Sequence, residues 1–266
     1  MPLWRARALR KRWRYVGFFS ERLMIAAAQV EVGPSGQTFW AVLDRERGEL
    51  HERTRMRLPG RSTEVWTEGA PLGGEGATRT RVESRDVRIA MRMGAAPWVE
   101  SISPTAAGGY TWTRKRPTPA RCEVTLNDRT LAEAGCAIED ESAGYHPRRT
   151  AWMWSAGVGA LDDGRSASWN LVTGINDPPV NSERTIWIDG EAAEPAPVRF
   201  DSLNGVTFED GSELSFTSQA ERSRRENLVV IRSRYRAPFG SFSGTLPGGL
   251  TLGSGLGVME SHEATW

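Results

Sequence analysis

The sequence predicts an all-β fold of short antiparallel strands with very little helix. Three observations lead to this prediction. Apolar and polar residues alternate over short stretches, turn-forming pairs separate these stretches, and apolar residues rarely recur at helical spacing. Val87–Met93 shows the alternation most clearly, because every odd position is apolar and Arg88 and Arg92 lie between them. A chain of such half-buried strands forms a β-sandwich or a β-barrel.

The predicted strands follow one another at short intervals. Asp-Gly pairs at Asp163, Asp189 and Asp210 mark turns between them, because glycine adopts positive φ angles without steric cost. One short helix is expected at Thr130–Ala134, with Asp128 as its N-cap. The predicted strands are Leu23–Val32, Gln37–Asp44, Thr78–Glu83, Val87–Met93, Tyr110–Arg114, Cys122–Leu126, Arg149–Val158, Ala167–Thr173, Thr185–Ile188 and Leu228–Tyr235.

A polar stretch of small residues near the middle of the chain, residues 139–144, is the expected domain boundary. It divides the chain into residues 1–143 and 144–266, and each part holds enough predicted strands for one small barrel. No internal sequence repeat relates the two parts, so their similarity rests on strand number alone.

Composition and charge exclude several classes of protein. The chain has 266 residues, of which 39% are hydrophobic and 25% are charged, as in a globular protein with a buried core. Its 34 basic and 33 acidic residues give a net charge of +1, so bulk charge does not recruit nucleic acid. No apolar stretch approaches the roughly 18 residues that an integral membrane helix needs.

The N-terminal stretch from Arg5 to Arg14 is basic, but the apolar core of a signal peptide does not follow it. Cys122 and Cys136 fit no metal or redox spacing. A cytoplasmic protein with reduced thiols is therefore the favoured interpretation, and a single disulfide across a hairpin is the alternative. The basic stretch itself is either a solvated leader or a peripheral contact with a lipid surface or RNA.

The familiar catalytic motifs are missing from the sequence. It contains no GxSxG elbow, Walker loop, GxGxxG after a strand, HExxH or EF-hand loop. The three histidines, His51, His146 and His262, lie far apart and show no metal-ligand spacing. We therefore expect neither a metal nor a cofactor.

Tryptophan occurs 11 times, spread along the whole chain. Indole rings bring large apolar surfaces, and each buried N–H group needs an acceptor. A lined ligand cavity and the packed core of a β protein explain this density equally well. The tryptophans considered for such a cavity are Trp40, Trp152, Trp154 and Trp169.

Polar side chains within aromatic strands are the other candidates for a site. Asn170 follows a tryptophan in an apolar run, where an inward amide finds partners or costs about 1–3 kcal/mol. Asn176 and Asp177 precede two prolines, so a turn with local hydrogen bonds is the simpler interpretation. Glu183 lies next to an arginine, and a solvated ion pair explains it as well.

Glu260 and His262 lie two positions apart near the end of the sequence. Alternate residues of a strand face the same side, so the carboxylate and the imidazole are placed for acid–base work. An exposed pair on an edge strand is the alternative. His146 also titrates near neutral pH, although a surface histidine beside a proline is an equal interpretation.

Seven ordered blocks span nearly the whole chain: Trp13–Gly17, Gly36–Val42, Gly144–Trp152, Trp169–Pro179, Ser182–Arg184, Tyr235–Gly240 and Gly255–Glu260. Together they resemble a bacterial family known as the domain of unknown function 2804. More distantly, the sequence is similar to tandem lipocalin-like proteins, which include carotenoid hydratases, tocopherol cyclases and some fungal Diels–Alder cyclases. This resemblance implies two tandem lipocalin-like (calycin-like) barrels or sandwiches.

The resemblance further implies an apolar small molecule bound in a tryptophan-lined β cavity. If the protein is an enzyme, the expected reaction is cofactor-independent hydration, isomerisation or cyclisation, as in a lyase or isomerase. Glu260 is the first candidate for the acid, with His262 as its partner and Asn170 as an orienting donor, because a carboxyl group in an apolar pocket has a raised pKa. The ligand-binding candidates are Trp40, His146, Trp152, Trp154, Trp169, Asp177, Glu183 and Tyr235.

Two further functions stay open at this point. One is a carrier of a lipid or pigment that performs no chemistry, and the other is a structural β protein whose tryptophans are ordinary core residues. The sequence does not determine the strand register, and a slip of one residue moves every side chain to the other face.

Overall fold

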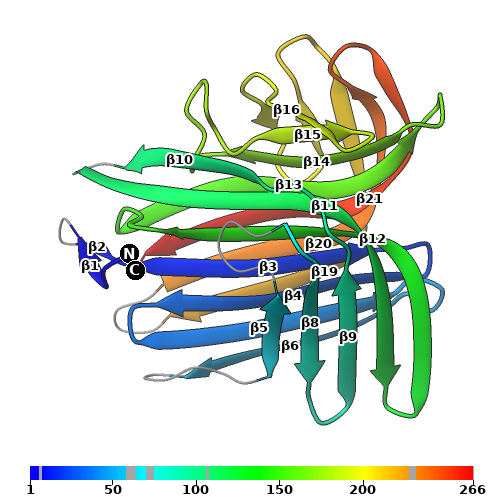
Figure 1. Ribbon diagram of the computed structural model, residues 1–266, viewed down its shortest axis with the longest axis horizontal. Helices are drawn as coiled ribbons and strands as arrows, with labels where there is room; N and C mark the ends of the chain where they lie inside the picture. The colour runs from blue at the N-terminus through cyan, green and yellow to red at the C-terminus, as the bar shows by residue number, and fades with distance from the viewer. Residues whose placement is uncertain (6–7, 58–63, 70–74, 106–107, 228–231, 266) are drawn as a thin grey trace. The chain divides into compact units, whose positions relative to one another are not determined.

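The computed structural model describes residues 1–5, 8–57, 64–69, 75–105, 108–227 and 232–265 (Figure 1). Across these residues the chain has no α-helix and folds into antiparallel strands joined by short turns, which confirms the all-β prediction. None of the described segments is a helix of the length and hydropathy needed to span a membrane.

Twelve strands precede residue 145 and nine follow it among the described residues. The first set is β1 (Trp4–Arg5), β2 (Ala8–Leu9), β3 (Lys11–Phe19), β4 (Leu23–Val32), β5 (Ser35–Asp44), β6 (Glu49–Arg57), β7 (Val65–Gly69), β8 (Thr78–Glu83), β9 (Val87–Met93), β10 (Val99–Thr105), β11 (Gly109–Leu126) and β12 (Arg129–Gly144). The second set is β13 (Arg149–Leu161), β14 (Ser166–Thr173), β15 (Thr185–Ile188), β16 (Glu191–Ala193), β17 (Arg199–Phe200), β18 (Gly205–Thr207), β19 (Glu213–Asn227), β20 (Arg232–Leu246) and β21 (Leu250–Thr265).

The contacts divide the chain into two compact units. Unit 1 contains Met1–Leu3, Leu9–Val99 and Arg114–Gly144, whereas unit 2 contains Trp4–Ala8, Glu100–Thr113 and Tyr145–Trp266. Each unit is built around one large antiparallel sheet that curls into a half-barrel, as a tandem lipocalin-like fold requires. Strands β1 and β2 form a separate two-stranded sheet.

The two large sheets have the same strand order. The first runs β6-β5-β4-β3-β12-β11-β9-β8-β7, with β10 paired to β11, and the second runs β16-β15-β14-β13-β21-β20-β19-β18-β17. Strands β3 to β6 thus correspond to β13 to β16, and β12 at the centre of the first sheet corresponds to β21 at the centre of the second. The topology therefore repeats where the sequence shows no repeat.

The alternation of the sequence decides which face of each strand is buried. In unit 1, Ile89 on β9 lies opposite Val82 on β8 and Val124 on β11, and all three side chains are buried. The intervening Arg88 and Arg92 are exposed, so β9 has the one apolar face that its period of two predicts. The core of unit 1 includes Val16, Phe18, Ile25, Trp40, Val42, Ile89, Met91, Cys122, Val124 and Ala137.

Unit 2 has its own apolar core. It collects inward-facing residues from β13, β14, β15, β18, β19, β20 and β21 together with the loops around β17 and β18. Trp169 is completely buried there, and its ring meets the edge of Phe242 at a centroid distance of 4.9 Å. The core includes Leu161, Trp169, Leu171, Ile186, Val206, Phe208, Leu214, Phe216, Phe242, Leu252 and Met259.

The predicted turns and several predicted strands are confirmed. Glycines 164, 190 and 211 have φ angles of 87°, 85° and 86°, and each lies in a turn between consecutive strands. Strands β4, β8, β9 and β15 have the predicted bounds. The predicted strands 110–114 and 122–126 are parts of one long strand, β11. Of the predicted strand 228–235, residues 228–231 lie outside the described part, and β20 begins at Arg232.

The predicted helix at Thr130–Ala134 is wrong, because these residues belong to β12. Asn127, with a φ of 53°, makes a tight turn with Asp128 between β11 and β12, so Asp128 is a turn residue and not a helix cap. Leu131 is buried while Thr130 and Ala132 are exposed, which is a strand pattern. Four good helix formers in a run of five residues do not outweigh pairing along a whole sheet.

Candidate functional site

Glu260 and His262 lie on β21, the central strand of the unit 2 sheet. Strand β13 pairs with one side of β21 and β20 with the other. The interpretation as an exposed pair on an edge strand is therefore wrong, because both edges of β21 are occupied. Both side chains are partly exposed.

Trp152 on β13 contacts both of these residues. Its indole Nε1 donates a hydrogen bond of 2.8 Å to Glu260 Oε1, and its ring lies 4.3 Å from the His262 ring at an interplanar angle of 50°. The register explains this arrangement, because Trp152 lies directly opposite His262 and Trp154 directly opposite Glu260. The carboxylate and the imidazole therefore share one face, as their spacing predicted.

Aromatic and hydroxyl groups surround the imidazole of His262. Tyr235 on β20 lies opposite it, edge to face, at a centroid distance of 5.3 Å, and Ser233 Oγ lies 2.8 Å from His262 Nε2. Burial, together with the charge of Arg222, lowers the pKa of His262 to about 3. The imidazole is therefore neutral at physiological pH. The Arg222 guanidinium stacks 4.8 Å from the Tyr235 ring.

Asn170 on β14 lies on the same strand face as these polar groups, at a fully buried position. Its Oδ1 accepts a hydrogen bond of 2.9 Å from Trp154 Nε1, and its Nδ2 donates one of 3.0 Å to the main-chain oxygen of Glu183. Asn170 has no exposed surface, so its amide group needs hydrogen-bond partners within the protein, and these two bonds supply them. By strand alternation, Trp169 points to the opposite face, into the unit 2 core.

The segment around Glu183 is buried, so the interpretation as a solvated ion pair is wrong. Glu183 is 6% exposed, and its Oε2 accepts a hydrogen bond of 3.4 Å from Asn176. The neighbouring Arg184 is 1% exposed, pairs with Glu194 at 3.6 Å and donates to the main-chain oxygen of Pro178 at 2.9 Å. This network fixes the loop between β14 and β15, which carries the main-chain oxygen that Asn170 uses.

Three other predicted site residues lie away from this face or in a turn. Asp177 accepts hydrogen bonds from the main-chain nitrogen of Gly174 at 2.7 Å and from Thr173 at 3.3 Å, as a turn requires. His146 is buried, and its Nδ1 lies 3.2 Å from Thr111 Oγ1, so it is not a surface histidine. Trp40 is buried in the core of unit 1.

The structure thus brings together part of the predicted set. Glu260, His262, Trp152, Trp154, Tyr235 and Asn170 share one face of four adjacent strands, β14, β13, β21 and β20. Trp169 faces the other way, and Asp177 closes a turn. Among the residues that the structure describes, no three His, Cys, Asp or Glu side chains are grouped to hold a metal ion.

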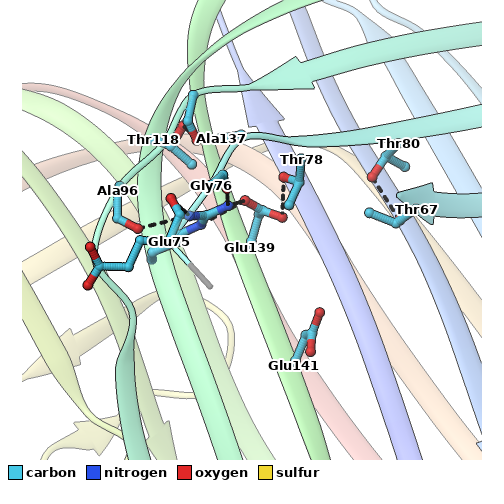
Figure 2. A network of polar contacts seen from close by, with 12 residues as sticks. Thr67, Glu75, Gly76, Thr78, Thr80, Ala96, Thr118, Ala137, Glu139 and Glu141 are labelled. Atoms are coloured by element: carbon cyan, nitrogen blue, oxygen red, sulfur yellow. Dashed lines mark hydrogen bonds and ion pairs between the residues drawn. The ribbon is translucent and has the colours of Figure 1, made fainter. Parts of the chain in front are cut away.

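Sequence reasoning missed a second group of polar residues, in unit 1. Five charged side chains, which we call the unit 1 polar cluster, meet on β3, β11 and β12: Arg14, Arg114, Arg116, Glu139 and Glu141. Figure 2 shows Glu139 between Thr78 and Gly76, with Glu141 further along the same strand. Charges at alternate positions on both strands of one hairpin are the signal that could have located it.

Comparison with solved structures gives the fold over nearly the whole chain. A protein of Nitrosomonas europaea assigned as AttH is 15% identical, with a TM-score of 0.54 over 95% of this chain and 92% of that one. Kievitone hydratase from Nectria haematococca is 13% identical, with a TM-score of 0.55 over 96% of this chain and 88% of that one. CghA is 10% identical, with a TM-score of 0.52 and the same coverage, 96% and 88%. At such identities the likeness concerns the fold alone.

No curated protein matches the sequence. The family described as Domain of unknown function (DUF2804) matches residues 80–266, which is more than two thirds of the chain and includes all of β13 to β21 up to the last residue. The chain therefore belongs to the domain of unknown function 2804 family.

Proposed function

We propose that unit 2 binds an apolar small molecule against its Trp152 and Trp154 strand face and transfers a proton to it from Glu260. The observation that supports this most is the contact of Trp152 with both Glu260 and His262. It places one carboxyl group and one neutral imidazole beside large aromatic surfaces, where both stay partly exposed. Metal and cofactor play no part in the proposed reaction.

The proposed chemistry is addition of a proton to a carbon–carbon double bond. The Glu260 carboxyl group gives its proton to one carbon, and the other carbon becomes electron-poor. Water, an internal nucleophile or loss of a neighbouring proton then completes hydration, cyclisation or isomerisation, and a proton returns to the carboxylate. The faces of Trp152 and Trp154 stabilise the transient positive charge, as aromatic rings do for cations.

The neighbouring groups have positioning roles in this proposal. His262 is neutral because its pKa is lowered to about 3, so it accepts or donates a hydrogen bond and adds no charge near the cation. The Trp152 N–H group fixes the Glu260 carboxyl group at 2.8 Å. Asn170 holds the Trp154 ring through its 2.9 Å hydrogen bond. Tyr235 packs the remaining side of His262.

Two of the proteins with a similar fold support the class of ligand and reaction. One is named as a hydratase of kievitone, and CghA has also been solved with Sch210972. The second candidate function is a carrier that binds an apolar molecule and catalyses no reaction, because the same aromatic face serves both functions.

The test is deuterium incorporation into unsaturated terpenoids and lipids in heavy water, measured by mass spectrometry. The Glu260→Gln variant is expected to lower the rate at least about a hundredfold, as removal of a general acid does. Glu263→Gln is the matched control, because Glu263 lies on the same strand but is exposed on the other face. Undiminished incorporation by Glu260→Gln contradicts the role of Glu260. Binding without any incorporation by the wild type identifies a carrier.

A further inference from the structure

Three exposed arginines form a row across neighbouring strands of unit 1, which we call the arginine row. Arg79 on β8 lies directly opposite Arg92 on β9, and Arg92 in turn lies directly opposite Arg121 on β11. All three side chains occupy outward positions that alternate with buried core residues. Residues directly opposite each other on antiparallel strands have Cβ atoms about 4.5–5.5 Å apart, so three positive charges are held close together.

The arginine row is not neutralised by acidic side chains. Within the described ranges, none of its three guanidinium groups forms an ion pair, and the residues outside these ranges include no Asp or Glu. Glu68 on β7 lies opposite Arg79 at the end of the row, where it sets one exposed negative charge against three positive charges. Like charges directly opposite each other destabilise a sheet, so a partner with several negative charges would relieve the repulsion.

A comparable row in unit 2 contains its own acidic residue. Arg225 on β19 lies opposite Arg234 on β20, and Arg234 lies opposite Glu263 on β21. These three side chains are also exposed. The arginine row of unit 1 therefore concentrates positive charge locally, although the whole chain has a net charge of only +1.

The surroundings of the arginine row favour a surface of phosphate groups as its partner. The other outward positions of β8 and β9 are Arg81, Glu83, Arg88 and Ala90, so these two strands present no outward aromatic or large apolar side chain. Binding of single-stranded nucleic acid uses aromatic rings that stack on bases, and binding of proteins uses buried aromatic or apolar anchors. Guanidinium groups bind phosphate oxygens in pairs, and mobile lipid headgroups can each adjust to one arginine.

We propose that the arginine row attaches unit 1 to the surface of an anionic phospholipid membrane. A layer of phosphate-bearing headgroups supplies several negative charges in one plane, which complements guanidinium groups on three adjacent strands. The attachment is electrostatic and peripheral, and it weakens as salt screens the charges. It does not rest on the reaction proposed for unit 2, because the arginine row lies entirely in unit 1.

The test is co-sedimentation with vesicles of phosphatidylglycerol and phosphatidylcholine in equal parts, compared with vesicles of phosphatidylcholine alone. At low ionic strength, wild-type protein is expected to bind the mixed vesicles at least about tenfold more tightly than the neutral ones. The triple variant Arg79→Gln, Arg92→Gln, Arg121→Gln is expected to bind the mixed vesicles about a hundredfold more weakly, because each arginine near an anionic surface contributes about fivefold.

The matched control is the triple variant Arg149→Gln, Arg225→Gln, Arg234→Gln. These arginines are exposed in unit 2, and both triple variants remove three positive charges from the chain. The control is expected to bind the mixed vesicles about as tightly as the wild type. An equal loss of binding in both triple variants would show that only net charge matters, and it would overturn the proposal.

Three other results would also overturn the proposal. These are equal binding of wild type to mixed and neutral vesicles, unchanged binding by the arginine-row variant, and binding of a uridine homopolymer RNA as tight as that of the mixed vesicles. Arg92→Glu covers the case in which the arginine-row variant does not fold, as judged by circular dichroism. It places a carboxylate between two arginines, which suits the sheet, and it is expected to weaken vesicle binding at least about tenfold. Unchanged binding by Arg92→Glu contradicts the proposal.

Discussion

Trp152 and Glu260 are 108 residues apart in the chain, yet the indole N–H of one donates a 2.8 Å hydrogen bond to the carboxylate of the other. The pairing of β13 with β21 brings them together. The same indole ring covers His262, so one side chain determines the position of both candidate acid–base groups.

Trp152→Phe distinguishes the effect of this hydrogen bond from the effect of ring packing. Phenylalanine keeps an aromatic surface against His262 but removes the donor to Glu260, which lowers the free energy of unfolding by about 0.5–1.5 kcal/mol. Because the carboxyl group then loses its orientation, deuterium incorporation should fall about tenfold or more. Trp112→Phe is the control, since its indole makes a 3.2 Å hydrogen bond to Glu100 at an exposed site. Equal effects of the two changes on incorporation would contradict the positioning role.

Asn170→Ala is expected to be strongly destabilising. It removes the hydrogen bond from the Trp154 N–H group and the one to the Glu183 main-chain oxygen, which keeps a longer bond of 3.4 Å from Thr185, in a place without solvent access. The expected loss is about 1–3 kcal/mol in urea unfolding, which is the typical cost when a buried polar group loses its hydrogen-bond partner. Asn204→Ala, at an exposed position, should change the unfolding free energy by less than about 0.5 kcal/mol. A loss at Asn170 as small as that at Asn204 would show that the amide is dispensable.

Stability is expected to fall at acidic pH through His262. Burial and Arg222 lower its pKa in the folded protein from 6.5 to about 3, so the unfolded chain binds a proton that the folded chain does not. This contribution is complete above about pH 6.5 and is lost as the pH falls toward about 3. Its slope is at most about 1.4 kcal/mol per pH unit, and less for a partly exposed side chain.

The check is the free energy of unfolding between about pH 7 and about pH 4.5. His262→Gln should have a shallower slope than the wild type, while Ser261→Ala, altered one residue earlier on β21, should have the wild-type slope. Parallel curves for wild type and His262→Gln would mean that the imidazole is protonated normally in the folded protein.

Gly157→Ala is expected to disturb the face of β13 that packs on Trp169. A methyl group there would overlap the Trp169 indole ring and approach the Leu256 main-chain oxygen to 2.8 Å. Such overpacking costs about 1–3 kcal/mol, measured by urea unfolding. Gly76→Ala meets no heavy atom within 4 Å and should stay within about 0.5 kcal/mol of the wild type. A neutral Gly157→Ala would contradict the close packing of Trp169.

Local patterns in the sequence predicted most of the fold, because alternation and Asp-Gly turns are encoded by neighbouring residues. The same local evidence failed at Thr130–Ala134, where the sheet overrides helix propensity. It placed Glu260 and His262 on one face correctly, since both lie on one strand. It could not predict that Trp152 contacts both residues, because this contact depends on the register in which β13 pairs with β21.

Buried charge was the feature least accessible from sequence. Arg114 and Arg116 look like solvated residues until their partners, Glu141 and Glu139, come opposite them across the β11–β12 hairpin. Arg14 joins them only through the pairing of β3 with β12. The similarity of the two units was likewise invisible, because it lies in the strand order and not in the residues.

The central claim is that unit 2 binds an apolar molecule on its tryptophan-bearing face. Native mass spectrometry of protein purified from its own host, followed by organic extraction, tests it most directly. We expect one apolar molecule per chain, retained by Glu260→Gln and lost from a Trp152→Ala, Trp154→Ala double variant that still folds. A wild-type protein that carries nothing, and whose thermal midpoint does not move with any member of a lipid and terpenoid panel, would contradict it.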